Sequence, residues 1–291
     1  MKKVFFVLFL ISFAVDLSAN NAENFRKKEI NFIKELYKGG RYFDCIAETE
    51  KIQISGKNPE IEYFIFTNYY LAGQYLTVIN NYAADFSSDE MKCTSLFLLS
   101  GSYFKKEMYT ESYEILRNLT YAELPEKYIF TMFLRRIEPL IFTDESGKID
   151  EEIKASGIFL KDNYNFQKLS EELQLYRKDN SKSSACAAVM SAIVPGLGQL
   201  YSGYPAEGII SLLSVAATAA GGFYMKDTGR KGFSYTMFFF SGLFYSGNIY
   251  GAYNSAESVN AEIRTSRHRS ITSQYGSYNP DDYVDIERVF K

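Results

Sequence analysis

The chain has 291 residues, enough for one large or two small domains with real cores, and its 46% hydrophobic content excludes wholesale disorder. The formal net charge of −3 argues against a protein that binds nucleic acid through bulk positive charge, so no nucleic-acid partner is expected. Three cysteines give no disulfide framework, and the single histidine, His268, excludes the common zinc patterns, so no metal site is expected.

Residues 1–19 have the pattern of a secretory signal peptide. Two lysines precede the uncharged apolar stretch 4–15, and the small residues Ser18 and Ala19 follow it. A helix of this length rises about 18 Å, well short of the roughly 30 Å hydrocarbon core of a bilayer. We therefore expect the following residues to be exported, with an uncleaved N-terminal anchor as the alternative.

The region 20–180 contains a recurring short turn between predicted helices. Apolar residues recur there at intervals of three and four, which predicts helices and no strands. Each turn ends in a tyrosine, and a residue of modest size follows three positions later, which lets the second helix of a pair approach the first. These residues are Tyr42, Tyr75 and Tyr109, which are 33 and 34 residues apart, and Cys45, Val78 and Ser112.

A period near 34 with two helices per unit resembles the tetratricopeptide repeat. The resemblance covers about 24–120, as three degenerate repeats, and implies an α-helical solenoid that binds a protein or peptide partner. The sequence departs from the family where the first helix usually has a small residue, at Ile33, Phe66 and Ser100. The many aromatic residues either pack between helices or line a groove for a partner, and the sequence leaves both interpretations open.

The composition changes at residue 181, where a membrane domain is expected over 181–256. Long charge-free runs predict membrane-spanning helices at 206–225 and 233–253, joined as a hairpin by the loop 226–231. This loop carries three basic residues and one acid, so the positive-inside rule places it in the cytoplasm. Three arginines after the second helix weaken this topology, because they would lie outside.

A glycine-rich motif, P-G-x-G-Q-x-Y-x-G, precedes the first predicted span. Over about 184–255 the motif and hairpin resemble a family of small two-helix bacterial membrane domains of unassigned function. That resemblance implies a membrane location in the bacterial cell envelope and no activity. A proline and two glycines interrupt the preceding helix, so 184–203 is expected at the membrane interface or partway in, with a third spanning helix as the alternative. The motif residues are Pro195, Gly196, Gly198, Gln199, Tyr201 and Gly203.

Small residues recur at helix-packing spacing in both predicted spans. Such residues let helices approach closely, either within the hairpin or in self-association or docking onto another membrane protein. The polar residues 257–291 are expected to form a largely disordered tail. The packing residues are Ser214, Thr218 and Gly222 in the first span, and Gly247 and Gly251 in the second.

No catalytic grouping of a nucleophile, base or metal ligand stands out, so neither enzyme activity nor a cofactor is expected. The sequence predicts an all-α protein with a signal peptide, a helical repeat solenoid and a membrane-embedded hairpin. We expect an integral membrane scaffold whose repeat domain, on the periplasmic side, binds a protein or peptide. The alternative is a membrane module whose hairpin binds lipid or self-associates, with the repeats as an accessory.

Overall fold

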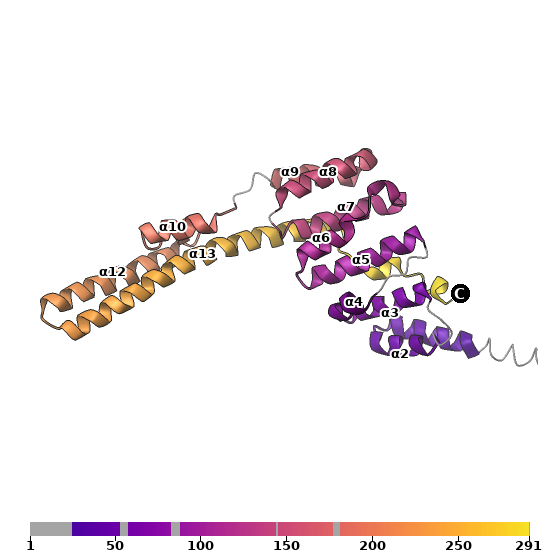
Figure 1. Ribbon diagram of the computed structural model, residues 1–291, viewed down its shortest axis with the longest axis horizontal. Coiled ribbons are helices and arrows are strands. Elements are labelled where there is room, and N and C mark those ends of the chain that lie inside the picture. Colours follow the sequence, from indigo (N-terminus) through magenta and orange to yellow (C-terminus); the bar gives the residue numbers. More distant parts are fainter. Residues whose placement is uncertain (1–24, 53–57, 83–87, 144, 177–180, 291) are drawn as a thin grey trace, which may run out of the picture. The chain divides into compact units, whose positions relative to one another are not determined.

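The computed structural model is all helical in the part of the chain that it describes, 83% helix with no strand (Figure 1). The chain forms two compact units, one up to Phe166 together with the residues from Ser277 onward, and the other from Gln167 to Gly276. The signal peptide expected at 1–19 lies outside the described residues. The described residues are 25–52, 58–82, 88–143, 145–176 and 181–290.

The first unit consists of consecutive pairs of packed helices, as the sequence predicts. In each pair the first helix is followed by a tight turn or a short connection and then by the second. The helices are a segment at 25–38, α2 (Tyr42–Ile52), α3 (Pro59–Leu71), α4 (Tyr75–Asn81), α5 (Asp89–Lys105), α6 (Tyr109–Arg117), α7 (Glu126–Leu140) and α8 (Ser146–Leu160), with a short 3₁₀ turn η2 (Tyr121–Glu123) before α7.

The three turns share one backbone geometry, and the predicted tyrosine begins the second helix each time, at the first residue of α2, α4 and α6. Two residues before the tyrosine the backbone is left-handed, with φ of 69° at Gly40, 77° at Gly73 and 60° at Glu107. The next N–H donates to the carbonyl five residues earlier and so satisfies an end group of the first helix. These bonds are Arg41 to Leu36 (2.9 Å), Gln74 to Tyr69 (2.8 Å) and Met108 to Tyr103 (3.0 Å).

The residues three positions after the turn tyrosines are buried between the two helices of their pairs. Cys45 and Val78 are 0% exposed and Ser112 is 1% exposed. The Ser112 hydroxyl donates to the carbonyl oxygen of Ser100 at 2.9 Å, and the Ser100 hydroxyl donates back to that of Ser112 at 2.8 Å. These reciprocal bonds hold α5 and α6 at close distance, because neither side chain extends beyond its hydroxyl.

Replacing Glu107 by glycine is expected to stabilise the protein by about 1 kcal/mol, since a left-handed backbone is unfavourable for a residue with a Cβ. The mirror substitution Gly73→Ala is expected to destabilise it by a similar amount, although open space surrounds the added methyl group. Urea denaturation of both variants checks this pair of predictions. Two shifts of the same sign would contradict the shared turn geometry.

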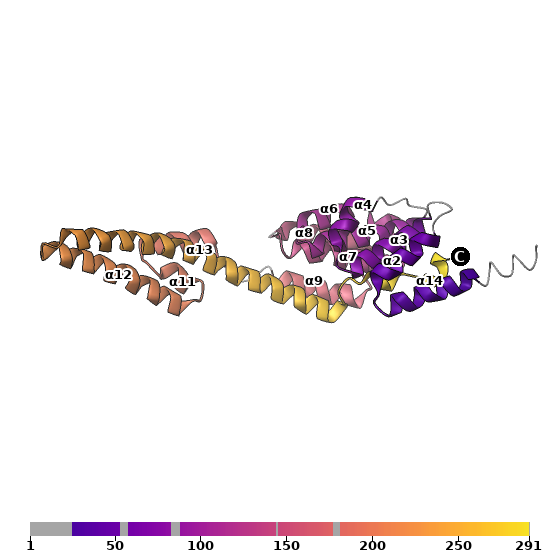
Figure 2. The same cartoon turned by 90° about the horizontal axis from the view of Figure 1, so that it is seen from below.

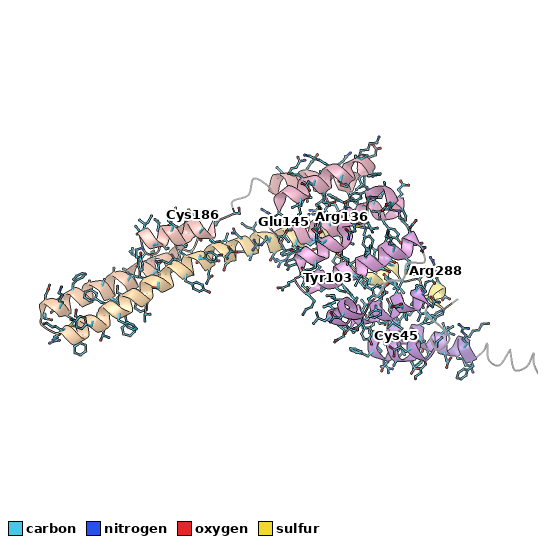
Figure 3. All side chains as sticks on the ribbon, viewed as in Figure 1. Cys45, Tyr103, Arg136, Glu145, Cys186 and Arg288 are labelled. Carbon is cyan, nitrogen blue, oxygen red and sulfur yellow. The ribbon has the colours of Figure 1, made fainter. Side chains whose placement is uncertain are left out.

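A buried ion pair ties the last three helices of this unit together. The Nη1 atom of Arg136 in α7 (labelled in Figure 3) lies 3.1 Å from a carboxylate oxygen of Glu152 in α8. The hydroxyls of Tyr113 and Tyr121 donate to the same carboxylate at 2.9 and 2.8 Å, and Arg136 also donates to the Leu116 carbonyl at 2.6 Å. The charge of Glu152 is therefore compensated and its oxygens have hydrogen-bond partners.

The second unit is built on two long helices, α12 (Pro205–Asp227) and α13 (Lys231–Tyr275), which pack along each other. Two shorter helices, α10 (Ser184–Ile193) and α11 (Leu197–Tyr201), pack against α13, and α9 (Tyr164–Tyr176) runs across the boundary of the two units. Among the described helices, α12 alone is long and apolar enough to cross a membrane, and 11% of its apolar window is buried.

The second expected span, 233–253, lies inside α13, which does not meet the same criterion of hydropathy. Tyrosine, serine, glycine and asparagine interrupt its phenylalanines and leucines, which lowers the mean hydropathy. α13 also continues beyond the expected end of the hairpin, to Tyr275, because no glycine or proline interrupts the polar stretch until Gly276. Gly276 ends the helix with a φ of 83°.

The C-terminal segment, residues 277–290, belongs to the first unit and packs on its helices, where the sequence predicts a largely disordered tail. It contains a 3₁₀ turn η3 (Pro280–Tyr283) and a short helix α14 (Ile286–Val289). Figures 1 and 2 show it in yellow beside α3 and α5. Average polarity predicts disorder here, but a few apolar side chains, among them Val289 and Phe290, find a preformed surface on which to be buried.

Candidate functional site

The first helices of successive pairs together form the surface that holds the C-terminal segment. We call the residues of helix 25–38, α3, α5 and α7 that contact this segment the first-helix surface. Contacts in the first unit join η3 to α3 and α5, and α14 to α3.

Tyr278 docks over a glycine of α5. A Cβ added at Gly101 would lie 2.6 Å from the Tyr278 ring, so the ring occupies the place where any other residue would have its side chain. The Tyr278 ring meets that of Tyr70 edge to face, with centroids 5.6 Å apart, and the Arg135 guanidinium lies 5.5 Å from its centroid. The site over Gly101 therefore favours a flat aromatic ring, which can lie directly against the backbone of α5.

A second aromatic anchor follows five residues later. The Tyr283 ring lies 5.7 Å from that of Phe97 in α5 and 6.1 Å from that of Tyr128 in α7, centroid to centroid. Tyr283 also stacks on Tyr278, so the two anchors support each other. The end of the segment is apolar as well, because Phe290 packs edge to face on Phe64 at 5.7 Å.

Charged and polar pairs align the segment along the surface. The Nε atom of Arg288 lies 2.8 Å from a carboxylate oxygen of Glu60, and its Nη1 atom lies 3.6 Å from Glu90. The other two pairs have the opposite sense, with acids on the segment and donors on the surface. They join Glu287 to Lys34, and Asp281 to the hydroxyl of Tyr37.

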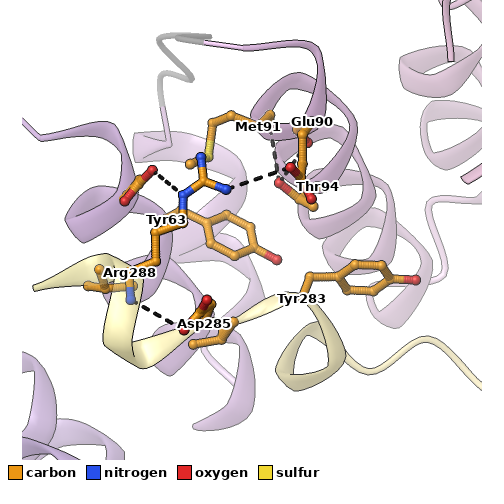
Figure 4. Close-up of a pocket in the computed structure, with 10 residues that line it drawn as sticks. Tyr63, Glu90, Met91, Thr94, Tyr283, Asp285 and Arg288 are labelled. Carbon is orange, nitrogen blue, oxygen red and sulfur yellow. Dashed lines mark hydrogen bonds and ion pairs between the residues drawn. The ribbon is translucent and has the colours of Figure 1, made fainter. Parts of the chain in front are cut away.

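A cavity of about 150 Å³ remains between the segment and the surface (Figure 4). Figure 4 shows the Arg288 side chain reaching across it toward α5, with Tyr63 on one side and Tyr283 on another. Carboxylates of Glu60, Glu90 and Asp285 line it together with Met91, Thr94 and the apolar tail residues Val284 and Val289. The segment therefore does not fill the space that the surface offers.

Glu90 and Tyr37 are among the groups at this surface whose pKa values are shifted. Hydrogen bonds from Lys127 and Tyr128 lower the pKa of Glu90, so the carboxylate stays charged beside Arg288 to a lower pH than usual. These attractions are present at neutral pH and are lost as the pH falls through that lowered pKa. Burial, and then the bond to Asp281, raise the pKa of Tyr37, which keeps its hydroxyl protonated as a donor.

In the second unit, three of the six motif residues, Gly196, Gly198 and Gln199, join a buried hydrogen-bond network. The Ser191 hydroxyl donates to the Gln199 side-chain oxygen at 2.9 Å and accepts from the Gly198 N–H at 2.9 Å. The Gln199 amide donates to the Asn248 carbonyl at 3.0 Å, and the Asn248 side chain accepts from the Gly196 N–H at 2.8 Å. Gln199 and Asn248 are 3% and 4% exposed, and their bonds link the motif to α13.

Two glycines of the motif allow a backbone approach that no other residue permits. A Cβ at Gly196 would lie 2.0 Å from the Gly208 carbonyl oxygen, and its φ is 88°. A Cβ at Gly198 would lie 1.9 Å from the carbonyl oxygen of Ala187. Pro195, half-buried in the turn before them, ends α10, and the left-handed Gly203, with a φ of 89°, ends α11.

Tyr201 has its own partners in the same unit. Its hydroxyl accepts from the Ser183 N–H at 3.2 Å, and the Lys182 ammonium lies 4.9 Å from its ring centroid. The ring packs beside a small cluster that contains Ala187 and Ala252. Tyr201 therefore fixes the start of α10 to the end of α11.

The predicted helix-packing residues divide into those that pack and those that do not. A Cβ at Gly222 would lie 2.8 Å from the Phe238 ring, and one at Gly251 would lie 3.4 Å from the Gln199 amide nitrogen. Gly247 has no atom within 4 Å of an added Cβ in the described structure, so it makes no close contact within the hairpin there. The Thr218 hydroxyl donates to the Ser214 carbonyl at 2.7 Å, a bond within α12.

Comparisons of the chain with models of protein families, with curated proteins and with solved structures find no match. Among the described residues, no three histidine, cysteine, aspartate or glutamate side chains gather in a group that could hold a metal ion.

Sequence reasoning missed the C-terminal segment as part of a site. The signal was present in the tail, where Tyr278, Tyr283 and Phe290 interrupt an acidic and polar stretch. The binding role of these rings could not be recognised, because the residues that they contact, such as Gly101, lie on helices far away along the chain.

Proposed function

We propose that the chain is a membrane-anchored scaffold whose first unit, a tetratricopeptide-like repeat domain, binds a protein or peptide partner near the membrane. The observation that carries this proposal is the first-helix surface, which already holds an irregular peptide segment through aromatic anchors and ion pairs. The shared turn geometry and the buried small residues of each pair support the comparison with that repeat. The proposal assigns no catalytic activity and no cofactor.

The second unit supports the membrane part of the proposal through its exposed apolar side chains. A water-soluble surface rarely carries large contiguous apolar patches, whereas lipid accommodates them. The exposed side chains include Ile209, Ile210, Leu212, Leu213 and Phe223 on α12, and Phe233, Phe239, Phe240, Leu243 and Phe244 on α13.

We place the protein in the bacterial cell envelope, with the repeat domain on the periplasmic side. The support is the basic character of the loop 226–231 and the signal-peptide pattern of 1–19. In this arrangement α12 and the first part of α13 form the hairpin that spans the bilayer. The buried network of the glycine-rich motif joins α10 and α11 to α13 beside this hairpin.

Photocrosslinking in cells tests the scaffold. A photoreactive residue in the full-length protein replaces Lys127, which adjoins the first-helix surface, or Glu90, which belongs to it; their side chains are 61% and 41% exposed. The matched controls are Phe43 on α2 and Leu76 on α4, which are 57% and 51% exposed on second helices. We expect one crosslinked partner from the first pair of positions and none from the controls.

Two results would contradict the scaffold. Equal crosslinking from all four positions would show that the partner contacts the domain without preference for the first-helix surface. Retention of the partner or of bound lipid after deletion of residues 24–120 would favour the alternative function, in which the hairpin binds lipid or self-associates and the repeats are an accessory. The observation that favours this alternative is the exposed apolar face of α12.

A further inference from the structure

We propose that the C-terminal segment is a releasable ligand of its own repeat domain, and that it competes with a partner peptide of the same chemistry for the first-helix surface. This inference rests on the proposed function and names the partner class and its regulation. The partner would be an acidic peptide with two tyrosine-type rings five residues apart, followed by an arginine and an apolar end.

The two ion pairs of the segment with Lys34 and Glu60 are exposed to solvent. The side chain of Glu287 is 75% exposed and that of Arg288 is 50% exposed, so water competes for both ion pairs. Ion pairs at such exposure contribute little to stability, and salt screens them. They align a bound segment without holding it permanently.

The fit of the segment is incomplete in two respects. The cavity lined by Glu60, Glu90 and Asp285 is left between the segment and the surface. The Tyr278 hydroxyl is buried and lacks a hydrogen-bond partner among the described residues, although the ring itself is well packed. A partner peptide that filled the cavity and paired that position would bind better than the segment, because unfilled space and unpaired polar groups both weaken binding.

The helix pairs have contacts of their own beneath the segment. Ser100 bonds to Ser112 within one pair, and Cys45 is buried against Ile33 in another, without any residue of the segment. Loss of the segment would uncover apolar surface around Phe64, where Phe290 and Val289 now pack. A newly uncovered apolar patch with charged groups at its rim is what a peptide partner requires.

The chemistry of the partner follows from the side chain that each position of the first-helix surface binds in this structure. The bare backbone at Gly101 accepts a flat ring, and the pocket of Phe97 and Tyr128 accepts a second ring. Lys34 favours an acid, and the carboxylates of Glu60 and Glu90 favour an arginine. The segment itself has four acids and one arginine, so an acidic peptide is the expected competitor.

A binding experiment with a synthetic peptide tests the competition. A fluorescent peptide with the sequence of residues 277–290 is titrated by anisotropy with the full-length protein and with a chain that ends at Gly276, both in detergent micelles. We expect binding to the shortened chain to be at least about tenfold tighter, because in the intact chain the competent state is only a minor fraction. Equal binding to both proteins would overturn the competition.

A charge exchange shows whether the peptide uses the observed surface. The peptide with Arg288→Glu is expected to bind the shortened chain about threefold to tenfold more weakly, because the change replaces weak attractions by repulsion from Glu60 and Glu90. Glu60→Arg in the shortened chain is expected to recover part of this loss. If the unaltered peptide binds but neither substitution changes its affinity, the peptide binds at another surface. That result would overturn the assignment of the first-helix surface as its binding site.

Hydrogen exchange of the unaltered protein provides a test that needs no truncation. Amides of residues 278–289 are expected to exchange at least about tenfold faster than those of α3 and α5, since they open without unfolding of the helices. Exchange as slow as in those helices, or loss of the helical signal in the shortened chain, would show that the segment belongs to the core. Crosslinking from Lys127 would then still support the scaffold, so the two proposals fail separately.

Discussion

Replacing Glu152 by glutamine is expected to lower the free energy of unfolding by about 3 kcal/mol or more, which is the usual effect of removing one partner of a buried ion pair. The substitution keeps the size of the side chain but removes the charge that compensates Arg136. Tyr113 and Tyr121 donate to different oxygens of this carboxylate, and glutamine replaces one of them by an amide nitrogen that cannot accept, so one hydroxyl also loses its acceptor. Urea denaturation of the full-length protein, followed by far-ultraviolet circular dichroism, measures the change.

The matched control is Glu114→Gln on the surface of α6. The side chain of Glu114 is 43% exposed and pairs with Arg117 at 3.3 Å, so an effect of about 0.5 kcal/mol or less is expected.

Burial and the neighbouring Glu152 carboxylate raise the pKa of Tyr113, which keeps its hydroxyl a donor throughout the accessible pH range. Equal effects of the two substitutions would show that the buried charge contributes no more than a surface pair.

Replacing Gly198 by alanine is expected to destabilise the second unit by about 3 kcal/mol, at the upper end of the effects of overpacking. The added Cβ would lie 1.9 Å from the Ala187 carbonyl oxygen and 2.7 Å from the Ala252 Cβ. The first of these is a backbone atom, so the clash cannot be relieved by turning a side chain. Separation of the helices would also break the bond between the Gly198 N–H and the Ser191 hydroxyl.

Gly247→Ala is the control for this substitution, because it adds the same methyl group to α13 in open space. Alanine favours a helix interior over glycine, so a neutral effect or a gain of up to about 1 kcal/mol is expected. Thermal unfolding of both variants in the same detergent measures the difference. A loss at Gly247 as large as that at Gly198 would mean that Gly247 packs against a second molecule.

The helix pairs were predictable because their signals are local. The turn tyrosines begin α2, α4 and α6, and the residues three positions later are buried, since both properties depend on residues within one turn of each other. In the third turn Glu107 stands where the second has Gly73, and only the structure shows that its backbone is left-handed.

The glycine-rich motif was predictable as a break between helices, but its bonding was not. Pro195 and the glycines after it interrupt the helix by rules that apply to any chain. That Gln199 is buried and donates to Asn248 depends on how α11 packs on α13, 49 residues away along the chain. The spacing of Gly247 and Gly251 places them on one helix face, yet only Gly251 lies close to a neighbour within the described structure.

By itself, the sequence determined the helical class, the consecutive helix pairs and the apolar character of α12, because propensity, turn geometry and hydropathy are properties of short stretches. Only the tertiary structure decided that the polar C-terminal residues would be ordered. Tyr278 is bound because Gly101 lacks a Cβ, and Arg288 is bound because Glu60 and Glu90 lie side by side. Such a surface exists only after helices that are distant in the sequence have packed together, and no local pattern contains it.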